Sequence, residues 1–131
     1  MCVAFMFKHK DLNALNPSSN WGERVDVAAY GTKFYTGRDK YGKAPYGTGS
    51  SIATPTVSGI SAILLSMSVE PDMVKRRIMA NTDPIYSFKS QGEPQTLGGG
   101  ALDALETVKH AISRLHPESR ALRGIDRLVS D

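Results

Sequence analysis

The segment Gly47 to Gly59, which reads GTGSSIATPTVSG, constrains the fold more than any other part of the sequence. It leads from a glycine-containing loop into a run without charged side chains, and we expect a helix from Ser51 to about Ser68. Ser50 or Ser51 can cap this helix, and Pro55 falls in or near its first turn, where a missing N–H costs least. The segment therefore predicts a buried, uncharged helix with a serine hydroxyl at its N-terminal end.

The uncharged run from Ala44 to Val69 is as long as a membrane-spanning helix, but its composition does not suit one. Prolines, glycines and hydroxyl-bearing residues interrupt it, and only Ile60 to Leu65 is densely apolar. A membrane span needs about 20 such residues. We therefore expect no membrane span in this run.

The charge of the chain is mild, with a formal net charge of +3. Its basic residues are scattered along the sequence, without the aromatic-interleaved patch that is typical of nucleic-acid-binding surfaces. We therefore expect no nucleic-acid partner. Cys2 is the only cysteine, so no internal disulfide can form.

Two strands are expected in the N-terminal part of the chain. Residues Cys2 to Phe7 are apolar throughout, as buried parallel strands are, and they are too short for a signal peptide. Val25 to Ala29 is a second strand candidate. The polar segment Lys8 to Gly22 between them is rich in turn-forming residues and is expected to be a surface loop.

A second loop is expected from Thr32 to Gly49, where aromatic residues alternate with many glycines and lysines. A short hairpin within it would bring Phe34 or Tyr35 near Tyr41. This loop ends at the serine-bearing helix.

Two further helices are expected in the C-terminal half. One starts at Glu70 to Asp72, runs through Met79 and ends before Pro84, since the residue preceding a proline resists helical geometry. Gly98 to Gly100 indicates a tight backbone passage, and a third helix follows from about Leu102 to Leu115. Its apolar stripe, expected to pack in the core, comprises Leu102, Leu105, Val108, Ala111, Ile112 and Leu115. Residues 119–131 are expected to form a short amphipathic helix or a loose tail.

Ser51 is a candidate nucleophile because of its place at the start of a helix. The first N–H groups of a helix have no partner within it, so the N–H of Ser51 can stabilise a developing oxyanion, and the helix dipole favours negative charge there. A serine in this place can also serve only as a cap. Ser50 competes for the role of nucleophile, but Pro55 stands four residues after Ser51 and five after Ser50.

This spacing carries a resemblance to a known family. The subtilisin-like serine proteases have the motif G-T-S-M-A-x-P-x-V-x-G, and Ser51 to Gly59, reading SIATPTVSG, aligns with it without a gap. Ser50 then replaces the usual threonine. The resemblance implies that Ser51 is the nucleophile and a backbone oxyanion donor. It also implies that the preceding residues bind the polypeptide substrate: Gly47, Thr48, Gly49 and Ser50.

The resemblance extends over most of the chain. Ser19 to Gly31 is similar to the family's S-N-x-G … V-D-V-x-A-P-G, with Tyr30 in place of the proline, and Val74 to Pro84 is similar to V-K-x-x-L-x-x-T-A-x-P. Gly98 to Ala104 resembles G-x-G-x-V-N-A. The implied fold is α/β, the C-terminal part of a subtilisin-like three-layer fold with a parallel sheet, incomplete here. Residues 1–116 would be that domain portion, and residues 117–131 a C-terminal extension or tail.

The other catalytic motifs of the family are absent from this sequence. It contains neither D-[ST]-G nor H-G-T-x-V-A-G, and it lacks the A-A-G-N stretch that holds the oxyanion asparagine. His9, His110 and His116 stand elsewhere and are read as structural or solvated residues. We therefore expect the chain to be a C-terminal fragment that is inactive alone, and a complementing N-terminal chain is an expected partner.

Two alternatives remain open at this point: a non-catalytic peptide-binding or interaction fragment, and a truncated gene product without a function of its own. No metal site and no cofactor are identifiable in the sequence, although the resemblance makes calcium possible in the complete domain. The resemblance also favours a secreted protein, while this chain shows no signal peptide.

Overall fold

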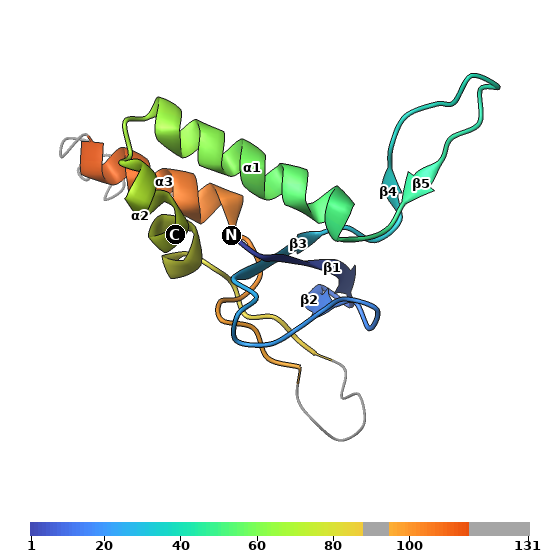
Figure 1. The fold of residues 1–131 in the computed structure, drawn as a ribbon, viewed down its shortest axis with the longest axis horizontal. Coiled ribbons are helices and arrows are strands. Elements are labelled where there is room, and N and C mark those ends of the chain that lie inside the picture. Colours follow the sequence, from blue (N-terminus) through green and yellow to red (C-terminus); the bar gives the residue numbers. More distant parts are fainter. Residues whose placement is uncertain (88–94, 116–131) are drawn as a thin grey trace, which may run out of the picture.

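The computed structural model describes residues 1–87 and 95–115 (Figure 1). It contains a small sheet, a projecting hairpin and a layer of helices on one face of the sheet. In chain order, the elements are β1 (Val3–His9), β2 (Leu12–Leu15), β3 (Val27–Tyr30), β4 (Phe34–Tyr35), β5 (Tyr46–Gly47), α1 (Ser50–Ser66), α2 (Pro71–Ala80) and α3 (Ala104–Leu115).

The main sheet has the strand order β2-β1-β3. β1 and β3 are parallel, with Val3 opposite Val27 and Met6 opposite Tyr30, so the two predicted strands are confirmed. β2 runs antiparallel to β1 and lies inside the segment predicted to be a surface loop, so that prediction is wrong. Lys10 and Asp11 adopt positive φ angles of 46° and 65°, and this turn reverses the chain directly after β1.

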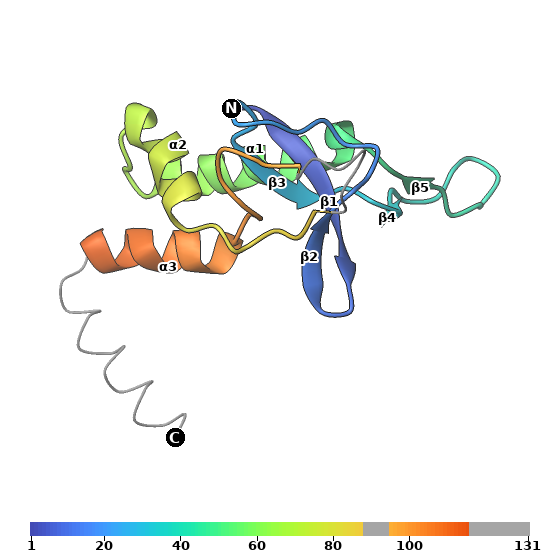
Figure 2. The same ribbon diagram turned by 90° about the horizontal axis from the view of Figure 1, so that it is seen from below.

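β1 is apolar from Val3 to Phe7, where side chains on both faces of the sheet are covered, and ends in the exposed Lys8 and His9. Phe5 packs with Val57 of α1 and Ile78 of α2 in the core between sheet and helices. Ala4 and Met6 point the other way, into a second core beneath the sheet that also contains Ala28 and Ala101. Irregular segments rather than helices cover this second face in the described part of the chain (Figure 2).

α1 begins one residue earlier than expected and differs from the prediction at its start. Gly49 occupies the N-cap position and no side chain caps the helix, so the expected serine cap is wrong. Pro55 lies inside the helix, in its second turn. Only Ala53, Val57 and Leu64 are buried, so the helix is covered on one face alone.

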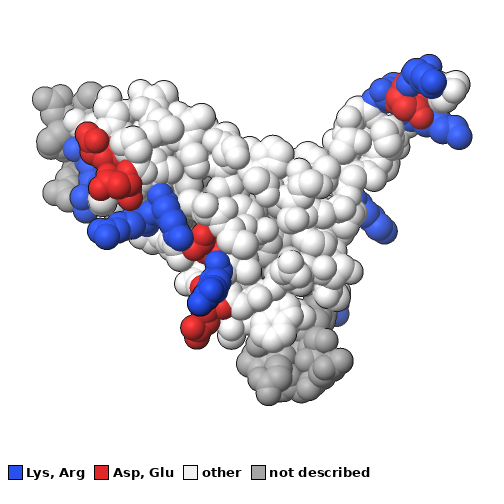
Figure 3. All heavy atoms as spheres, in the orientation of Figure 1, with Lys and Arg blue, Asp and Glu red and all other residues white. Residues whose placement is uncertain are grey.

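The open face of α1 is uncharged. The helix has no charged residue from Ser50 to Ser66, and Ile63 and Leu65 are 43% and 47% exposed. Figure 3 shows this face as a broad area without charged side chains. Most other exposed residues of the helix are serines and threonines, so this face is uncharged but not uniformly apolar.

α2 and α3 pack against α1 and against each other, with bounds close to those predicted. α3 buries Thr107 and Ala111, whereas Leu105, Ile112 and Leu115 are exposed, so the predicted apolar stripe is only partly in the core.

The predicted tight passage at Gly98 to Gly100 is confirmed. A Cβ at Gly98, Gly99 or Gly100 would lie 2.4, 2.4 and 2.2 Å from a backbone oxygen of Glu23, Asp26 or Asp83. This closeness allows Ala28 to donate to Gly100 O and Leu102 to donate to Ala28 O, at 3.0 and 2.7 Å. The glycine segment therefore extends the sheet beyond β3.

The predicted hairpin within residues 32–49 is confirmed, but the expected pairing of Phe34 or Tyr35 with Tyr41 is wrong. Phe34 pairs with Gly47 and Tyr35 with Tyr46, whereas Tyr41 lies near the tip. The rings of Tyr35 and Tyr46 meet edge to face at 5.9 Å.

None of the helices in residues 1–87 and 95–115 has the length and apolar character needed to cross a membrane.

Candidate functional site

Four backbone hydrogen bonds link the carboxyl end of the parallel strands to the first turn of α1. Gly31 N donates to Met6 O at 3.1 Å, and Gly49 N donates to Gly31 O at 2.8 Å. Gly49 O in turn accepts from Ile52 and Ala53, at 3.1 and 3.3 Å. The first turn of α1, and Ser51 with it, is therefore held at the edge of the sheet where β1 and β3 end.

Ser51 is exposed, and its hydroxyl makes no hydrogen bond to another described residue. The same holds for the backbone N–H groups of Ser50 and Ser51, which precede the first intrahelical bond. The first turn of α1 contains no acidic residue, so no carboxylate there offsets the positive end of the helix dipole. The site combines a free hydroxyl with two free N–H donors.

The predicted substrate-binding residues form the passage from β5 into α1. Thr48 Oγ1 accepts a hydrogen bond from Lys33 N at 2.9 Å. Gly49 has a φ of 146°, which favours glycine, and a Cβ there would lie 3.7 Å from Ser51 Oγ. At Gly47 a Cβ would lie 2.7 Å from Ile52 Cδ1, so a larger residue there would displace the Ile52 side chain.

Asp26 is the most strongly bound carboxylate near the sheet. It accepts from Cys2 N at 2.7 Å and pairs with Lys75 Nζ at 2.8 Å. Burial raises the pKa of Asp26. The hydrogen bonds from Lys75 and from Cys2 N, together with the positive charges of Lys75 and the N-terminus, outweigh this effect and lower the pKa below its usual value. The residue ties β3 to α2 and has no contact with Ser51.

The histidines are placed by other contacts. His9 meets Phe7 edge to face at 6.2 Å, and Arg77 Nη1 lies 3.3 Å from His110 Nδ1, which joins α2 to α3. His116 lies outside the described residues, as do residues 117–131. No hydrogen bond links Ser51 to a base within residues 1–87 and 95–115.

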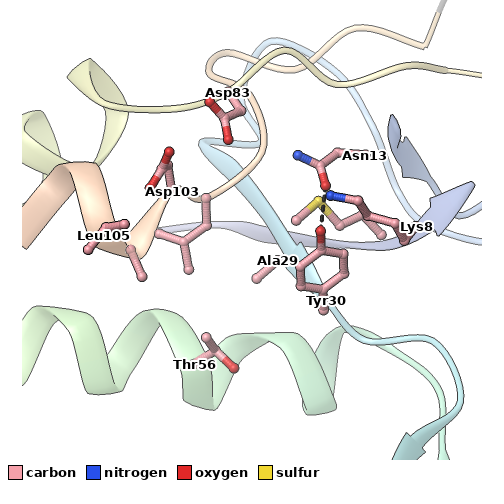
Figure 4. A pocket seen from close by; sticks show the side chains of 11 residues that line it. Lys8, Asn13, Ala29, Tyr30, Thr56, Asp83, Asp103 and Leu105 are labelled. Atoms are coloured by element: carbon pink, nitrogen blue, oxygen red, sulfur yellow. Dashed lines mark hydrogen bonds between the residues drawn. The ribbon is translucent and has the colours of Figure 1, made fainter. Parts of the chain in front are cut away.

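A hollow of about 340 Å³ opens between the ends of β1 and β3, α1 and the start of α3 (Figure 4). Tyr30 Oη donates to Asn13 Oδ1 at 2.5 Å at one side of it, so Tyr30 is tied to β2. Asp83 and Asp103 lie on the other side. Burial and the neighbouring Asp103 raise the pKa of Asp83.

A second hollow, of about 480 Å³, shares Lys8 and Tyr30 with the first and continues to Thr32 and Lys33. Ser51 lines neither hollow. The sequence did not indicate these hollows or the Asp26–Lys75 pair, because their residues are far apart in the chain and follow no local motif.

Comparison with known families decides what kind of domain this is. The sequence model of the Subtilase family matches residues 8–108, which include the whole of α1 and its serine. The chain belongs to the subtilase family.

Two curated subtilases show the same relationship. The chain is 38% identical over 61 residues to "Subtilase-type proteinase RRT12" of Saccharomyces cerevisiae, covering 46% of this chain and 12% of that protein. It is 32% identical over 79 residues to "Subtilisin-like protease 4" of Arthroderma gypseum, covering 60% of this chain and 20% of that protein. The chain thus spans a fifth or less of the length of these relatives.

Solved structures support the subtilase fold. Fervidolysin from Fervidobacterium pennivorans, described as a keratinolytic enzyme related to subtilisin, matches with a TM-score of 0.64 at 20% identity, over 82% of this chain and 18% of that one. The subtilase cytotoxin SubAB matches with a TM-score of 0.68 at 22% identity, over 90% and 38%. The predicted α/β fold is therefore confirmed, with a sheet that is partly parallel.

Proposed function

We propose that this chain supplies the nucleophile of a serine endopeptidase and that Ser51 is that nucleophile. The observation that carries the proposal is the free Ser51 hydroxyl beside the unpaired N–H groups of Ser50 and Ser51, at the positive end of α1. Membership in a family of serine proteases supports the reaction class. The free N–H of Ser51 would supply one donor of the oxyanion hole.

In the proposed reaction, Ser51 Oγ attacks the carbonyl carbon of a peptide bond while a histidine takes its proton. The tetrahedral oxyanion accepts a hydrogen bond from Ser51 N. The carbon–nitrogen bond then breaks, and the histidine gives its proton to the leaving amine. Water hydrolyses the resulting acyl-enzyme and restores the serine hydroxyl.

The histidine, the aspartate and the oxyanion asparagine are proposed to come from a complementing N-terminal portion of a subtilase domain. Two features support this: the chain spans a fifth or less of its curated relatives, and the uncharged outer face of α1 is open. In subtilisin itself, removal of the serine or the histidine alone lowers kcat about 2 × 10⁶-fold. We therefore propose that the 131-residue chain is inactive by itself.

Reconstitution tests this proposal. The chain is co-purified with an N-terminal subtilase portion that carries the missing motifs, and cleavage of a casein substrate is measured. We expect activity in the complex and its loss in the complex with Ser51→Ala, while Ser50→Ala retains most of it. Full activity with Ser51→Ala would show that another residue is the nucleophile.

Calcium binding and a secreted location are further proposals for the complete protein, and they rest on the family resemblance alone. Calcium-dependent protection of the reconstituted complex against thermal unfolding would test the first. Recovery of the natural protein from culture medium would test the second.

A further inference from the structure

The β4–β5 hairpin with its connecting loop, residues 32–49, projects from the body of the molecule (Figure 1). We name this segment the cationic hairpin. It contains Lys33, Arg38, Lys40 and Lys43 and one acidic residue, Asp39. Four positive charges less one negative charge give +3, which equals the formal net charge of the whole chain. Figure 3 shows basic side chains, with acidic atoms among them, at the tip of the projecting segment.

The acidic residue of the hairpin forms no ion pair with the hairpin's own basic side chains. Asp39 Oδ1 accepts from the backbone N–H groups of Tyr41 and Lys43, both at 2.9 Å, and so holds the turn together. Ion pairs elsewhere in the described residues join Lys75 to Asp26 and Lys109 to Glu106. None of the four basic residues of the hairpin makes an ion pair within residues 1–87 and 95–115.

The tip is a formed structure rather than a loose set of lysines. Asp39 N donates to Lys43 O at 2.9 Å, Gly42 N donates to Asp39 O at 3.0 Å, and Arg38 Nη1 donates to Gly42 O at 2.8 Å. Lys40 Nζ lies 5.0 Å from the centre of the Tyr41 ring. The charges are therefore presented on an ordered turn, which reduces the entropy lost when a ligand binds.

Aromatic side chains accompany the charges. Phe34, Tyr35, Tyr41 and Tyr46 are 48%, 50%, 76% and 65% exposed. Such residues give large contact areas with little loss of conformational entropy and are common in binding surfaces. The hairpin combines this contact surface with unpaired positive charge.

The base of the hairpin adjoins the candidate nucleophile. Gly47 ends β5 and packs against Ile52 in the first turn of α1, one residue from Ser51. Lys43 lies four residues before Gly47, which corresponds to about 13 Å of extended chain. An extended polypeptide with its scissile bond near Ser51 could therefore reach the tip with a residue about four positions away.

We propose that the cationic hairpin binds acidic polypeptide segments and thereby selects substrates that carry aspartate or glutamate several residues from the cleaved bond. The selection of substrates rests on the proposed role of Ser51, whereas the binding of acidic segments does not. Opposite charge supplies the attraction, and the exposed tyrosines pack against the bound chain. A polypeptide is favoured over a nucleic acid because the hairpin leads directly into the candidate peptidase site.

Binding is tested first, with the full chain carrying Ser51→Ala so that no cleavage interferes. Fluorescence anisotropy compares a labelled peptide containing a run of glutamates with the same peptide containing glutamines. We expect the glutamate peptide to bind about tenfold more tightly at low salt, and this preference to shrink at about 0.5 M salt.

The variant Lys40→Gln/Lys43→Gln removes two charges and leaves the Arg38 bond to Gly42 intact. The matched control Arg24→Gln/Arg76→Gln removes two exposed charges elsewhere, and circular dichroism checks the folding of both. We expect the hairpin variant to lose about fivefold in affinity for the glutamate peptide and the control to lose little. Equal losses in the two variants, or no loss in the hairpin variant, would overturn the proposal.

An oligonucleotide with the same number of charges serves as competitor. If it displaces the glutamate peptide at a much lower concentration than unlabelled peptide does, the hairpin is a nucleic-acid-binding element and the proposal is wrong. In the reconstituted complex, kcat/KM for a glutamate-containing substrate should fall about fivefold in the hairpin variant, and that for the glutamine-containing substrate should stay unchanged.

The two proposals can fail separately. Cleavage that depends on Ser51 without a preference for acidic peptides leaves the nucleophile in place and removes the hairpin's role. The opposite outcome is that the hairpin binds the glutamate peptide preferentially while cleavage in the complex does not require Ser51. That result would remove the proposed function and the selection of substrates, and only the binding of acidic segments would remain.

Discussion

Gly49 donates its backbone N–H to the carbonyl oxygen of Gly31 at 2.8 Å, and this bond attaches the start of α1 to the end of β3. Glycine at position 31 makes the approach possible, because a Cβ there would lie 2.7 Å from Gly49 O and 2.8 Å from Phe5 Cβ. The position of Ser51 therefore depends on a residue 20 positions earlier in the sequence.

Replacing this glycine should loosen the candidate site. Gly31→Ala is expected to lower the free energy of unfolding by about 1–3 kcal/mol, since the backbone of Gly49 cannot move without shifting the helix. Gly59 is the matched control, because a Cβ there has no neighbour within 4 Å in an exposed part of the helix. Gly59→Ala should stabilise the chain by up to about 1 kcal/mol in urea unfolding. A neutral Gly31→Ala would contradict this account of the junction.

The two faces of α1 should respond differently to truncation. Leu64 is fully buried, and Leu64→Ala is expected to cost about 2–5 kcal/mol of unfolding free energy. The adjacent Leu65 is 47% exposed, and Leu65→Ala should cost less than about 1 kcal/mol in the chain alone. Similar costs for both would mean that the outer face of α1 is already covered, contrary to the structure.

The contacts of Asp26 predict an acid-sensitive contribution to stability. Because the pKa of Asp26 is lowered in the folded state, its contribution is present at neutral pH and is lost as the pH falls below about 4. Asp26→Asn should therefore destabilise the chain by about 1–3 kcal/mol at pH 7 and by much less at about pH 2. Asp11→Asn, at an exposed turn, is the control. An Asp26→Asn effect that does not change with pH would refute the ionic part of this contact.

Asp83 should have the opposite effect, because burial and the neighbouring Asp103 raise its pKa. A raised pKa in the folded state means that ionisation opposes folding, so this cost grows as the pH rises through about 4 and is complete at neutral pH. Asp83→Asn should raise the melting temperature at pH 7, and the gain should vanish in acid. A gain that is equal at both pH values would require another explanation.

Local patterns predicted much of the fold. The apolar run at the start of β1, the helix that starts at Pro71 and ends before Pro84, and the glycine passage at Gly98 to Gly100 all agree with the structure. Each of these features depends on neighbouring residues or on steric limits that a sequence states directly. The position of Ser51 at the start of α1 was predicted in the same way.

Features that depend on distant residues were missed or misjudged. β2 was mistaken for a loop because it is only four residues long, stands among turn-forming residues, and forms a strand only by pairing with β1. The apolar stripe of α3 was expected in the core, but which residues face the core depends on the approach of α1 and α2. The charges of the cationic hairpin appeared scattered in sequence, and only the turn at Asp39 brings them together.

Fluorophosphonate labelling tests the central claim most directly, because the probe reacts only with a serine that a base has activated. We predict no labelling of the chain alone. In the complex with the N-terminal subtilase portion, we predict labelling that disappears with Ser51→Ala and persists with Ser50→Ala. Labelling of this chain within the complex that survives Ser51→Ala would contradict the assignment of the nucleophile. Labelling of the isolated chain at Ser51 would contradict its dependence on a base from outside.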